Sequence, residues 1–385
     1  MFENLLYQDK VRDALKREIT TGRLPPAIIF AGPPQSGKMT AALELARALN
    51  CKVSGAPWAC HCSSCAQYRL LDSPYMLLMG RRNFSDEIQA AQNMLMREKK
   101  KELYYLFLRN VKKLVRRFDY LLWQDDNRKL NTAIKFMDRL NELIGDPKKL
   151  NSDLMNRSEE IISSDLVHSI DQLLPADGIS INMLRRAVYW ARTADRSLNK
   201  TIIIENADSM NNSARNSLLK VLEEAPPQTF FILTTERPGA IVPTIRSRVR
   251  FFRFLSRKPE ELREVIRRVY RCSEAERYNT IQDFFDGILR GHIDREHVEL
   301  MFVLLRKKSI AARDTLAAYF RSDRQNMRRL IILCLEKLRT ALSGAEGNFE
   351  NVHELFIMQR KLEEMYYRCE TYNIPVASIL ECGYR

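Results

Sequence analysis

Apolar and polar residues alternate along the first 256 residues in a pattern that predicts helices separated by short buried strands. Residues 8–22, QDKVRDALKREITTG, have helical spacing and end at a glycine. The apolar run AIIFA at 27–31 has the length of a strand, and the helix formers of MTAALELARALN follow a loop rich in Gly and Pro. Two more apolar runs, at 201–205 and 229–235, flank the helical SARNSLLKVLEEA. This alternation indicates an α/β fold, a mostly parallel sheet with helices on both faces.

The strand signals fade towards the C-terminus. Segments such as EELREVIRRVY and RRLIILCLEKLRTAL are helical, so the chain changes from α/β to all-α near Ser256 and Arg257. We therefore expect a domain boundary at this position.

A region from about 84 to 176 interrupts the α/β part. Apolar residues recur every three or four positions, in one series from Phe107 to Leu121 and a second from Leu130 to Ile144. The polar QDDNRK between the two series predicts a helical hairpin or a short antiparallel coiled coil. From Arg97 to Phe118, nine Lys and Arg stand against two Glu. Such a face can contact nucleic acid, although a solvated helix surface is the commoner explanation.

Composition places the chain among soluble globular proteins. Of its 385 residues, 45% are hydrophobic and 29% are charged. No apolar run is long enough to span a bilayer, and the start MFENLLYQDK lacks the layout of a secretory signal. We therefore expect a cytoplasmic protein with no membrane partner. The net charge of +14 favours a polyanionic partner such as nucleic acid, although a merely soluble basic protein has the same property.

The cysteines are unevenly placed. Four of the eight lie within fifteen residues, whereas the others are scattered singly. Disulfides are rare in a reducing compartment, so the cluster indicates a metal site and the lone cysteines indicate buried small hydrophobes. The clustered residues are Cys51, Cys60, Cys62 and Cys65.

The loop GPPQSGKMT nearly fits the phosphate-binding pattern G-x-x-x-x-G-K-[ST]. Gly32, Gly37 and Lys38 match, and the loop joins a strand to a helix, whose N-terminal N–H groups and dipole attract phosphates. Met39 stands where a hydroxyl should hold Mg²⁺. Thr40 carries a hydroxyl, but one residue along a helix is a rotation of about 100°, so that hydroxyl points elsewhere.

An ATPase also needs an acidic pair at the end of a later strand, one carboxylate to support Mg²⁺ and one to polarise the attacking water. This sequence has Glu205 and Asn206 there. Glu205 can still reach a metal, whereas the Asn206 amide cannot act as a base. Two groups that ATP hydrolysis requires, the metal-binding hydroxyl and the second acid, are therefore missing. This combination indicates a degenerate nucleotide site and leaves open whether ATP or ADP still binds.

Three stretches carry a resemblance to a known family: GRLPPAIIFAGPPQSGKMTAALELARALNC, IIIENADSMNNSARNSLLKVLEEAPPQTFFILTT and PTIRSRVRFF. They resemble the AAA+ subunits of bacterial DNA polymerase III clamp loaders, with delta-prime as the best match and gamma/tau as the nearest alternative. The similar residues are 2–78 and 177–255. The resemblance implies an AAA+ phosphate-loop domain at 1–256, a small helical lid at 257–300 and an all-α oligomerisation collar at 301–385. The insertion at about 84–176 is absent from the usual pattern.

The resemblance also implies roles for individual residues. In this family a Ser-Arg-Cys motif projects its arginine into the neighbouring subunit's ATP site. Ser247 and Arg248 match this motif, and Val249 replaces the cysteine. A guanidinium supplied in trans stabilises charge on the transferring phosphoryl group, although Arg248 is otherwise one of several arginines on a solvated strand edge. Thr235 falls where the family places the residue that senses the γ-phosphate.

The family further implies a structural zinc module, here at 51–65, with four cysteines spaced C-x8-C-x2-C-x2-C. In this chain the spacing is C-x8-C-x1-C-x2-C, one residue short. Because Zn²⁺ imposes little geometry beyond the tetrahedron, we expect the four thiolates to hold zinc. His61, the single residue between the second and third cysteines, is an alternative ligand.

Three hypotheses for function follow. The favoured one is a non-hydrolysing, delta-prime-like subunit of a hetero-pentamer with gamma/tau and delta, which contributes Arg248 in trans while a sliding clamp is loaded at primed DNA. The first alternative is an active gamma/tau-type ATPase that uses Thr40 and Glu205 in unorthodox ways. The second is a non-enzymatic scaffold that binds DNA through its basic insertion.

Overall fold

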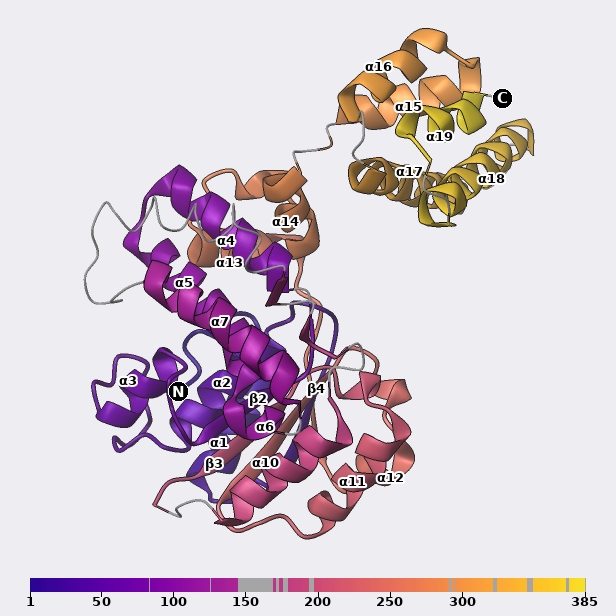
Figure 1. The fold of residues 1–385 in the computed structure, drawn as a ribbon. Helices are drawn as coiled ribbons and strands as arrows, with labels where there is room; N and C mark the ends of the chain where they lie inside the picture. The colour runs from indigo at the N-terminus through magenta and orange to yellow at the C-terminus, as the bar shows by residue number, and fades with distance from the viewer. Residues whose placement is uncertain are drawn as a thin grey trace. The chain divides into compact units, whose positions relative to one another are not determined.

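The chain forms two compact units, Met1–Phe285 and Asp286–Arg385, each described here by itself (Figure 1). The computed structural model describes residues 1–384 except for these positions: 83, 125, 145–168, 171–172, 176–178, 194–196, 291–292, 294, 321–323, 345–348 and 372–373. No helix among the described residues combines the length and the apolarity needed to cross a bilayer.

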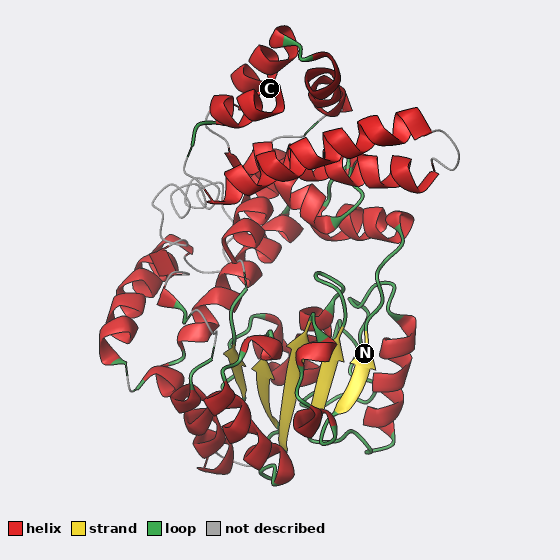
Figure 2. Cartoon of the chain, turned by 90° about the vertical axis from the view of Figure 1, so that its right-hand side faces the viewer, coloured by secondary structure: helices red, strands yellow, loops and turns green. Residues whose placement is uncertain are grey.

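Five parallel strands build one sheet in the order β2-β3-β4-β1-β5, with helices on both of its faces (Figure 2). The strands are β1 (Ala27–Ala31), β2 (Met76–Met79), β3 (Lys200–Ile204), β4 (Thr229–Thr235) and β5 (Arg250–Arg253). Every residue of β1, β2 and β3 is buried, as expected for parallel strands covered on both sides. The predicted α/β fold with a parallel sheet is therefore confirmed.

Three helices around the sheet begin and end close to where the periodicity predicts: α1 (Asp9–Thr20), α2 (Lys38–Ala48) and α11 (Asn212–Glu223). Two others, α10 (Ile181–Thr193) and the short α12 (Pro243–Arg246), were not predicted. The strands β2 and β5 were not predicted. MLLM and RFFR are only four residues long, and a run of that length is too short to separate a strand from a helix by periodicity.

The insertion forms a helical layer, but the predicted hairpin is wrong in its pairing. The helix α5 (Lys101–Val115) packs along α4 (Phe84–Glu98), whereas α7 (Asn127–Ile144) packs on α6 (Tyr120–Trp123) and on the 3₁₀ turn η1 (Arg116–Phe118). The sequence series that begins at residue 107 meets an apolar face on α4 that was overlooked. Buried residues on that face are Phe84, Ile88, Ala91, Met94 and Leu95. Part of the predicted insertion, residues 145–168, lies outside the described residues.

The first unit extends past the sheet to α13 (Pro259–Tyr270) and into α14 (Ile281–Arg290), where the division between the units falls. The second unit is all-α, as predicted from the loss of strand signals. Its helices are α15 (Arg295–Lys307), α16 (Ile310–Phe320), α17 (Arg324–Gly344), α18 (Phe349–Thr371) and α19 (Val376–Tyr384). The assignment of a lid to 257–300 and a collar to 301–385 stays a prediction.

Candidate functional site

The phosphate loop joins β1 to α2, as its sequence predicts. Gly37 has φ 102°, a left-handed conformation that favours glycine, and α2 (Lys38–Ala48) begins directly after it. The Lys38 ammonium folds back onto its own loop, where Nζ donates to the carbonyl oxygens of Gly32 at 2.9 Å and Pro33 at 2.5 Å. Burial lowers the pKa of Lys38. The lysine therefore faces a site that is poor in solvent.

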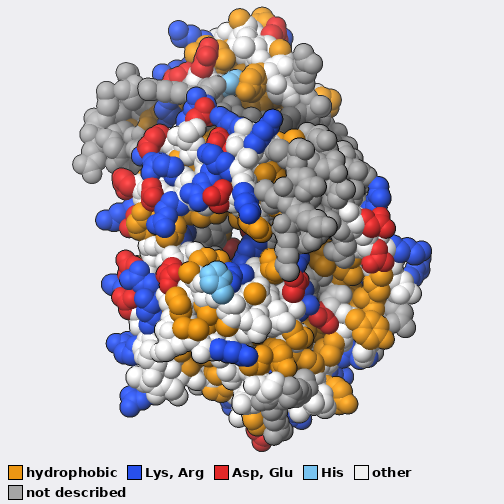
Figure 3. All heavy atoms as spheres, turned by 90° about the vertical axis from the view of Figure 1, so that its left-hand side faces the viewer, with side chains coloured by type: hydrophobic (Ala, Val, Ile, Leu, Met, Phe, Trp, Pro, Cys, Tyr) orange, Lys and Arg blue, Asp and Glu red, His pale blue; other side chains and the backbone are white. Residues whose placement is uncertain are grey.

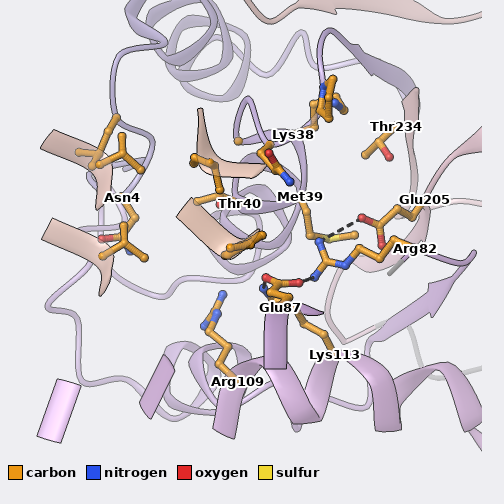
Figure 4. Close-up of a pocket in the computed structure, with 18 of the residues that line it drawn as sticks. Asn4, Lys38, Met39, Thr40, Arg82, Glu87, Arg109, Lys113, Glu205 and Thr234 are labelled. Carbon is orange, nitrogen blue, oxygen red and sulfur yellow. Dashed lines mark hydrogen bonds and ion pairs between the residues drawn. The ribbon is translucent and has the colours of Figure 1, made fainter. Parts of the chain in front are cut away.

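A cavity of about 450 Å³ opens in front of this loop. Gly37, Lys38, Met39, Thr40 and Glu205 all line it, so the structure brings these predicted residues together (Figure 4). Met39 is buried and Thr40 is exposed. Because Thr40 also lines the cavity, the displacement of its hydroxyl from the metal position stays a prediction.

Two predicted residues, Gly32 and Thr235, are not among the residues that line the cavity. A Cβ at Gly32 would lie 2.5 Å from the carbonyl oxygen of Phe254, so glycine is required there for close packing. The Thr235 hydroxyl donates to Asp208 at 2.7 Å. Its neighbour Thr234 lines the cavity instead, because successive side chains of a strand point to opposite faces.

The surroundings of Glu205 differ from those of a carboxylate that supports a metal ion. Its Oε2 accepts from Arg117 at 2.5 Å and its Oε1 accepts from Arg82 at 3.3 Å, so both oxygens are bound by guanidinium groups. Gly80 makes this arrangement possible, because a Cβ at that position would lie 2.2 Å from the Glu205 carbonyl oxygen. Both oxygens of this carboxylate are therefore already paired with cations, which disfavours the approach of a magnesium ion.

Asn206 has a structural role in this site. Its backbone has φ 52°, its N–H donates to the Thr234 hydroxyl at 3.3 Å, and its side-chain Nδ2 donates to the Arg81 carbonyl oxygen at 2.8 Å. The amide therefore ties the end of β3 to β4 and to the loop after β2. This placement agrees with the inference that residue 206 does not act as a base.

The insertion adds further charged groups to the cavity. Arg109 and Lys113 from α5 and Glu87 from α4 line it opposite the phosphate loop (Figure 4). Lys113 Nζ donates to Glu87 at 2.9 Å, and burial, only partly offset by Glu87, lowers the pKa of Lys113 to about 8. Burial also lowers the pKa of Arg109 and of Arg117 to about 10. These cations are therefore paired or poorly hydrated.

Sequence reasoning missed these insertion residues as parts of the site. No motif marks them, and the available signal was the excess of Lys and Arg between residues 97 and 118. That excess was attributed to a surface, whereas at least seven of its nine members have partners inside the first unit. They are Arg97, Lys100, Arg109, Lys112, Lys113, Arg116 and Arg117. On the face drawn in Figure 3, basic side chains are interspersed with acidic ones.

The four clustered cysteines come together as predicted. Cys51, Cys60, Cys62 and Cys65 place their sulfur atoms within 4.8 Å of one another. Backbone N–H groups point at three of these sulfurs, at 3.4 to 3.5 Å from Cys51, Cys60 and Cys62. This donor set fits a tetrahedral metal ion with thiolate ligands, such as zinc. His61 is exposed and does not belong to the cluster.

A buried arginine supports the fourth cysteine. Arg47, at the end of α2, is 1% exposed and donates to the Cys65 sulfur at 3.0 Å and to the carboxylate of Glu44. Burial raises the pKa of the Cys65 thiol, and the Arg47 guanidinium partly offsets that shift because it favours the thiolate. The same arginine binds the carbonyl oxygens of Ala56 and Pro57, which fixes the loop of the cluster against α2.

The Ser-Arg-Val motif lies on the surface, outside the cavity. Arg248 is exposed, donates to the Thr244 carbonyl oxygen at 2.9 Å and pairs with Glu223 at 2.7 Å. Ser247 is exposed too, and Val249 is half-buried before β5. Since the pair with Glu223 is solvent-exposed, breaking it costs at most about 1 kcal/mol.

Comparison with known proteins gives a match over most of the first unit. The family model described as "DNA polymerase III, delta subunit" matches residues 7–258. The DNA polymerase III subunit delta' of Bacillus subtilis is 35% identical over 95 residues, which are 24% of this chain and 29% of that protein. The gamma/tau subunit of Mycobacterium bovis is 31% identical over 86 residues, 22% of this chain and 14% of that protein.

A wider relative is the replication factor C small subunit of Aeropyrum pernix, 28% identical over 176 residues, 45% of this chain and 52% of that protein. The chain therefore spans between 14% and 52% of these curated relatives. Among solved structures, a gamma subunit-related protein of Thermotoga maritima aligns with TM-score 0.30 and 17% identity, over 59% of this chain and 89% of that one. The family match, the phosphate loop and the parallel sheet together show that the chain belongs to the DNA polymerase III clamp-loader family of AAA+ proteins.

Proposed function

We propose that this chain is a delta-prime-like, non-hydrolysing subunit of a clamp loader that lends Arg248 to the ATP site of a neighbouring subunit. The observation that carries the proposal is the occupation of both Glu205 oxygens by Arg82 and Arg117. With Met39 in place of the hydroxyl and Asn206 in place of an acid, the chain's own site lacks two of the groups that hold magnesium and activate water, and the third, Glu205, is paired with arginines.

Partners follow from the family. The relatives include subunits named delta' and gamma/tau of DNA polymerase III, so we infer a hetero-pentamer with gamma/tau and delta subunits that loads a sliding clamp onto primed DNA. The exposure of Arg248 and its solvent-exposed partner Glu223 support a role in trans, because the guanidinium can exchange that partner for a phosphate at small cost.

Zinc is the metal that we assign to the four-cysteine cluster, in a structural role. All four positions of the tetrahedron are supplied by thiolates, which leaves no coordination site for water or substrate. The cluster therefore contributes to the fold of residues 51–65 and takes no part in chemistry.

The test is the substitution Arg248→Ala in a loader reconstituted with its companion subunits. Because an arginine finger supplied in trans is worth about 10³–10⁵ in rate, the ATPase turnover of the adjacent site should nearly disappear. Arg253→Ala, an exposed arginine on the neighbouring strand β5, is the matched control and should keep full DNA-stimulated ATPase. An assembled Arg248→Ala loader with normal DNA-stimulated ATPase would contradict the role in trans.

The two alternatives make different predictions. An active gamma/tau-type ATPase would hydrolyse ATP as an isolated chain and lose that activity with Lys38→Ala. A non-enzymatic DNA-binding scaffold would bind DNA with an affinity that falls steeply with salt and survives loss of Arg248. The internal partners of the insertion cations weigh against the scaffold, since Lys112 and Arg116 bind Asp72 and the Ser73 carbonyl oxygen respectively.

A further inference from the structure

The cavity beside the phosphate loop has the size of a ligand site and is lined by both polar and apolar side chains. Its volume of about 450 Å³ lies within the range of pockets that hold small molecules and cofactors. Part of the lining is polar and comes from the phosphate loop and α5. Another part is apolar and includes Leu6, Val265, Val269, Ile281 and Phe285.

The place of a metal ion within this cavity is taken by protein cations. Arg82 bridges two carboxylates, with terminal nitrogens 3.3 Å from Glu205 and 2.6 Å from Glu87. Arg117, 1% exposed, donates to the second Glu205 oxygen and is not among the residues that line the cavity. Met39 occupies the position of the metal-binding hydroxyl and offers only a thioether. A magnesium ion would have to displace a protein cation to reach the paired oxygens of Glu205 and Glu87.

The charge of the lining favours an anion. Among the described residues that line the cavity, five are cationic and three are anionic. The cations are Lys38, Arg82, Arg109, Lys113 and Arg257, and the anions are Glu87, Glu205 and Glu236. This excess of two positive charges in a poorly solvated space attracts phosphate groups and repels a divalent cation.

We propose that the cavity binds the polyphosphate of a nucleoside di- or triphosphate without magnesium, with Arg82 and the α5 cations Arg109 and Lys113 in place of the metal. The backbone N–H groups at the start of α2 contact the phosphates. The apolar part of the lining contacts the base. This contact makes the cavity prefer a nucleotide to inorganic polyphosphate. This role of the insertion is separate from that of Arg248.

The experiment is calorimetric titration of the full chain with ADP and ATP, in buffers freed of divalent metal by resin and in the same buffers with magnesium. Soluble chelators are avoided because they would strip the cysteine cluster. We expect the Kd in metal-free buffer to be no higher than the Kd with magnesium, and the two values to agree within about threefold. Adenosine and tripolyphosphate, as separate probes, should each bind at least about tenfold more weakly than ADP.

Variants connect the binding to the insertion. Arg109→Ala should weaken metal-free ADP binding by about tenfold, because one charge-assisted contact is lost. Arg109→Gln keeps a donor for the Arg69 carbonyl oxygen and should show a similar loss, which separates ligand binding from misfolding. Lys112→Ala, on the same helix but paired with Asp72 outside the cavity, should bind as the wild type does.

Four results would overturn the proposal: no nucleotide binding in either buffer, magnesium-dependent tightening of about tenfold or more, tripolyphosphate binding as tight as that of ADP, or unchanged affinity in both Arg109 variants. Because the titration uses the chain without companion subunits, each of these results leaves the proposed role of Arg248 untouched.

Discussion

At the scale of single residues, the site beside the phosphate loop differs from that of an active ATPase because protein cations bind the carboxylate oxygens that would otherwise face a metal ion. Glu205 accepts from Arg117 and Arg82, and Asn206 ties strands together through its amide. Burying a guanidinium is costly unless it is paired, and Arg117 at 1% exposure is paired with Glu205 and with the Gly80 carbonyl oxygen. The carboxylate that once suggested a metal ligand is therefore needed to stabilise a buried arginine.

We expect the proposed nucleotide binding to depend on pH through Lys113. It faces Glu87 on α4, and it also faces Arg82 and Arg109; burial lowers its pKa to about 8, so its ammonium is lost as the pH rises through that value. An anionic ligand favours the charged form, so metal-free ADP binding should weaken by up to about tenfold between pH 7 and pH 9. Calorimetric titration across this range measures the effect.

The matched chain for this experiment is Lys113→Met, which keeps the length of the side chain and removes its charge. Its affinity should be lower at pH 7 and should change less with pH than that of the wild type. Lys38 titrates equally in both chains, so the difference between the two profiles isolates Lys113. Parallel profiles would show that Lys113 does not contact the ligand.

At the scale of elements, α5 connects the cysteine cluster with the cavity beside the phosphate loop. Arg109 donates to the Arg69 carbonyl oxygen at the end of α3 (Ser63–Arg69), and Lys112 pairs with Asp72 just beyond it. Cys62 caps the N-terminus of α3 and Cys65 lies within it, so two cysteines of the cluster position the segment that α5 packs against. The cluster thus supports the insertion as well as its own loop.

We expect the purified chain to contain one zinc ion and to be destabilised when that ion is lost. Cys65→Ser should abolish the bound zinc and lower the melting temperature by several degrees, because a thiolate site supplies folding energy to the loop that it closes. Elemental mass spectrometry and thermal unfolding measure the two effects.

The control is Cys382→Ser, which changes a cysteine of α19 outside the cluster and should leave the zinc content unchanged. A wild-type chain that is purified without zinc and takes up none when it is supplied would show that the assignment of the metal is wrong.

At the scale of the whole molecule, the described residues of each compact unit form a hydrophobic core of their own. The core of the second unit is formed by fully buried residues of α15 to α19, among them Met301, Leu304, Leu316, Leu330 and Ile379. About a hundred residues with a core of their own are enough for an independent domain. Residue 286, at the start of this unit, is an aspartate whose carboxylate pairs with Arg329 at 3.1 Å.

Residues 286–385 expressed alone should therefore fold. Circular dichroism should show a helical protein that unfolds cooperatively with temperature, and Leu330→Ala should lower its free energy of unfolding by about 2–5 kcal/mol, the usual cost of a core cavity. Lys337→Ala, which removes an exposed pair with Glu299, is the control and should cost at most about 1 kcal/mol. A gradual, non-cooperative melting curve would refute the independence of this unit.

Several features of this protein could be predicted from local sequence patterns. The phosphate loop and its defects at Met39 and Asn206, the buried strands, and the cluster around Cys60 depend on contiguous residues, whose spacing dictates backbone geometry and chemistry. The change from α/β to all-α structure and the family itself followed from the same kind of pattern. Short elements such as β2 escaped because four apolar residues fit a strand or a helix equally well.

The pairing of Glu205 with protein cations was decided by the tertiary structure alone. Arg82 and Arg117 lie 123 and 88 residues from Glu205 along the chain, and no local pattern relates them. Helical periodicity marks the apolar face of α5 but not the element that covers it, so the hairpin was assigned to α7 rather than α4. Charge pairing and helix packing depend on which distant surfaces meet, and spacing along one segment does not contain that information.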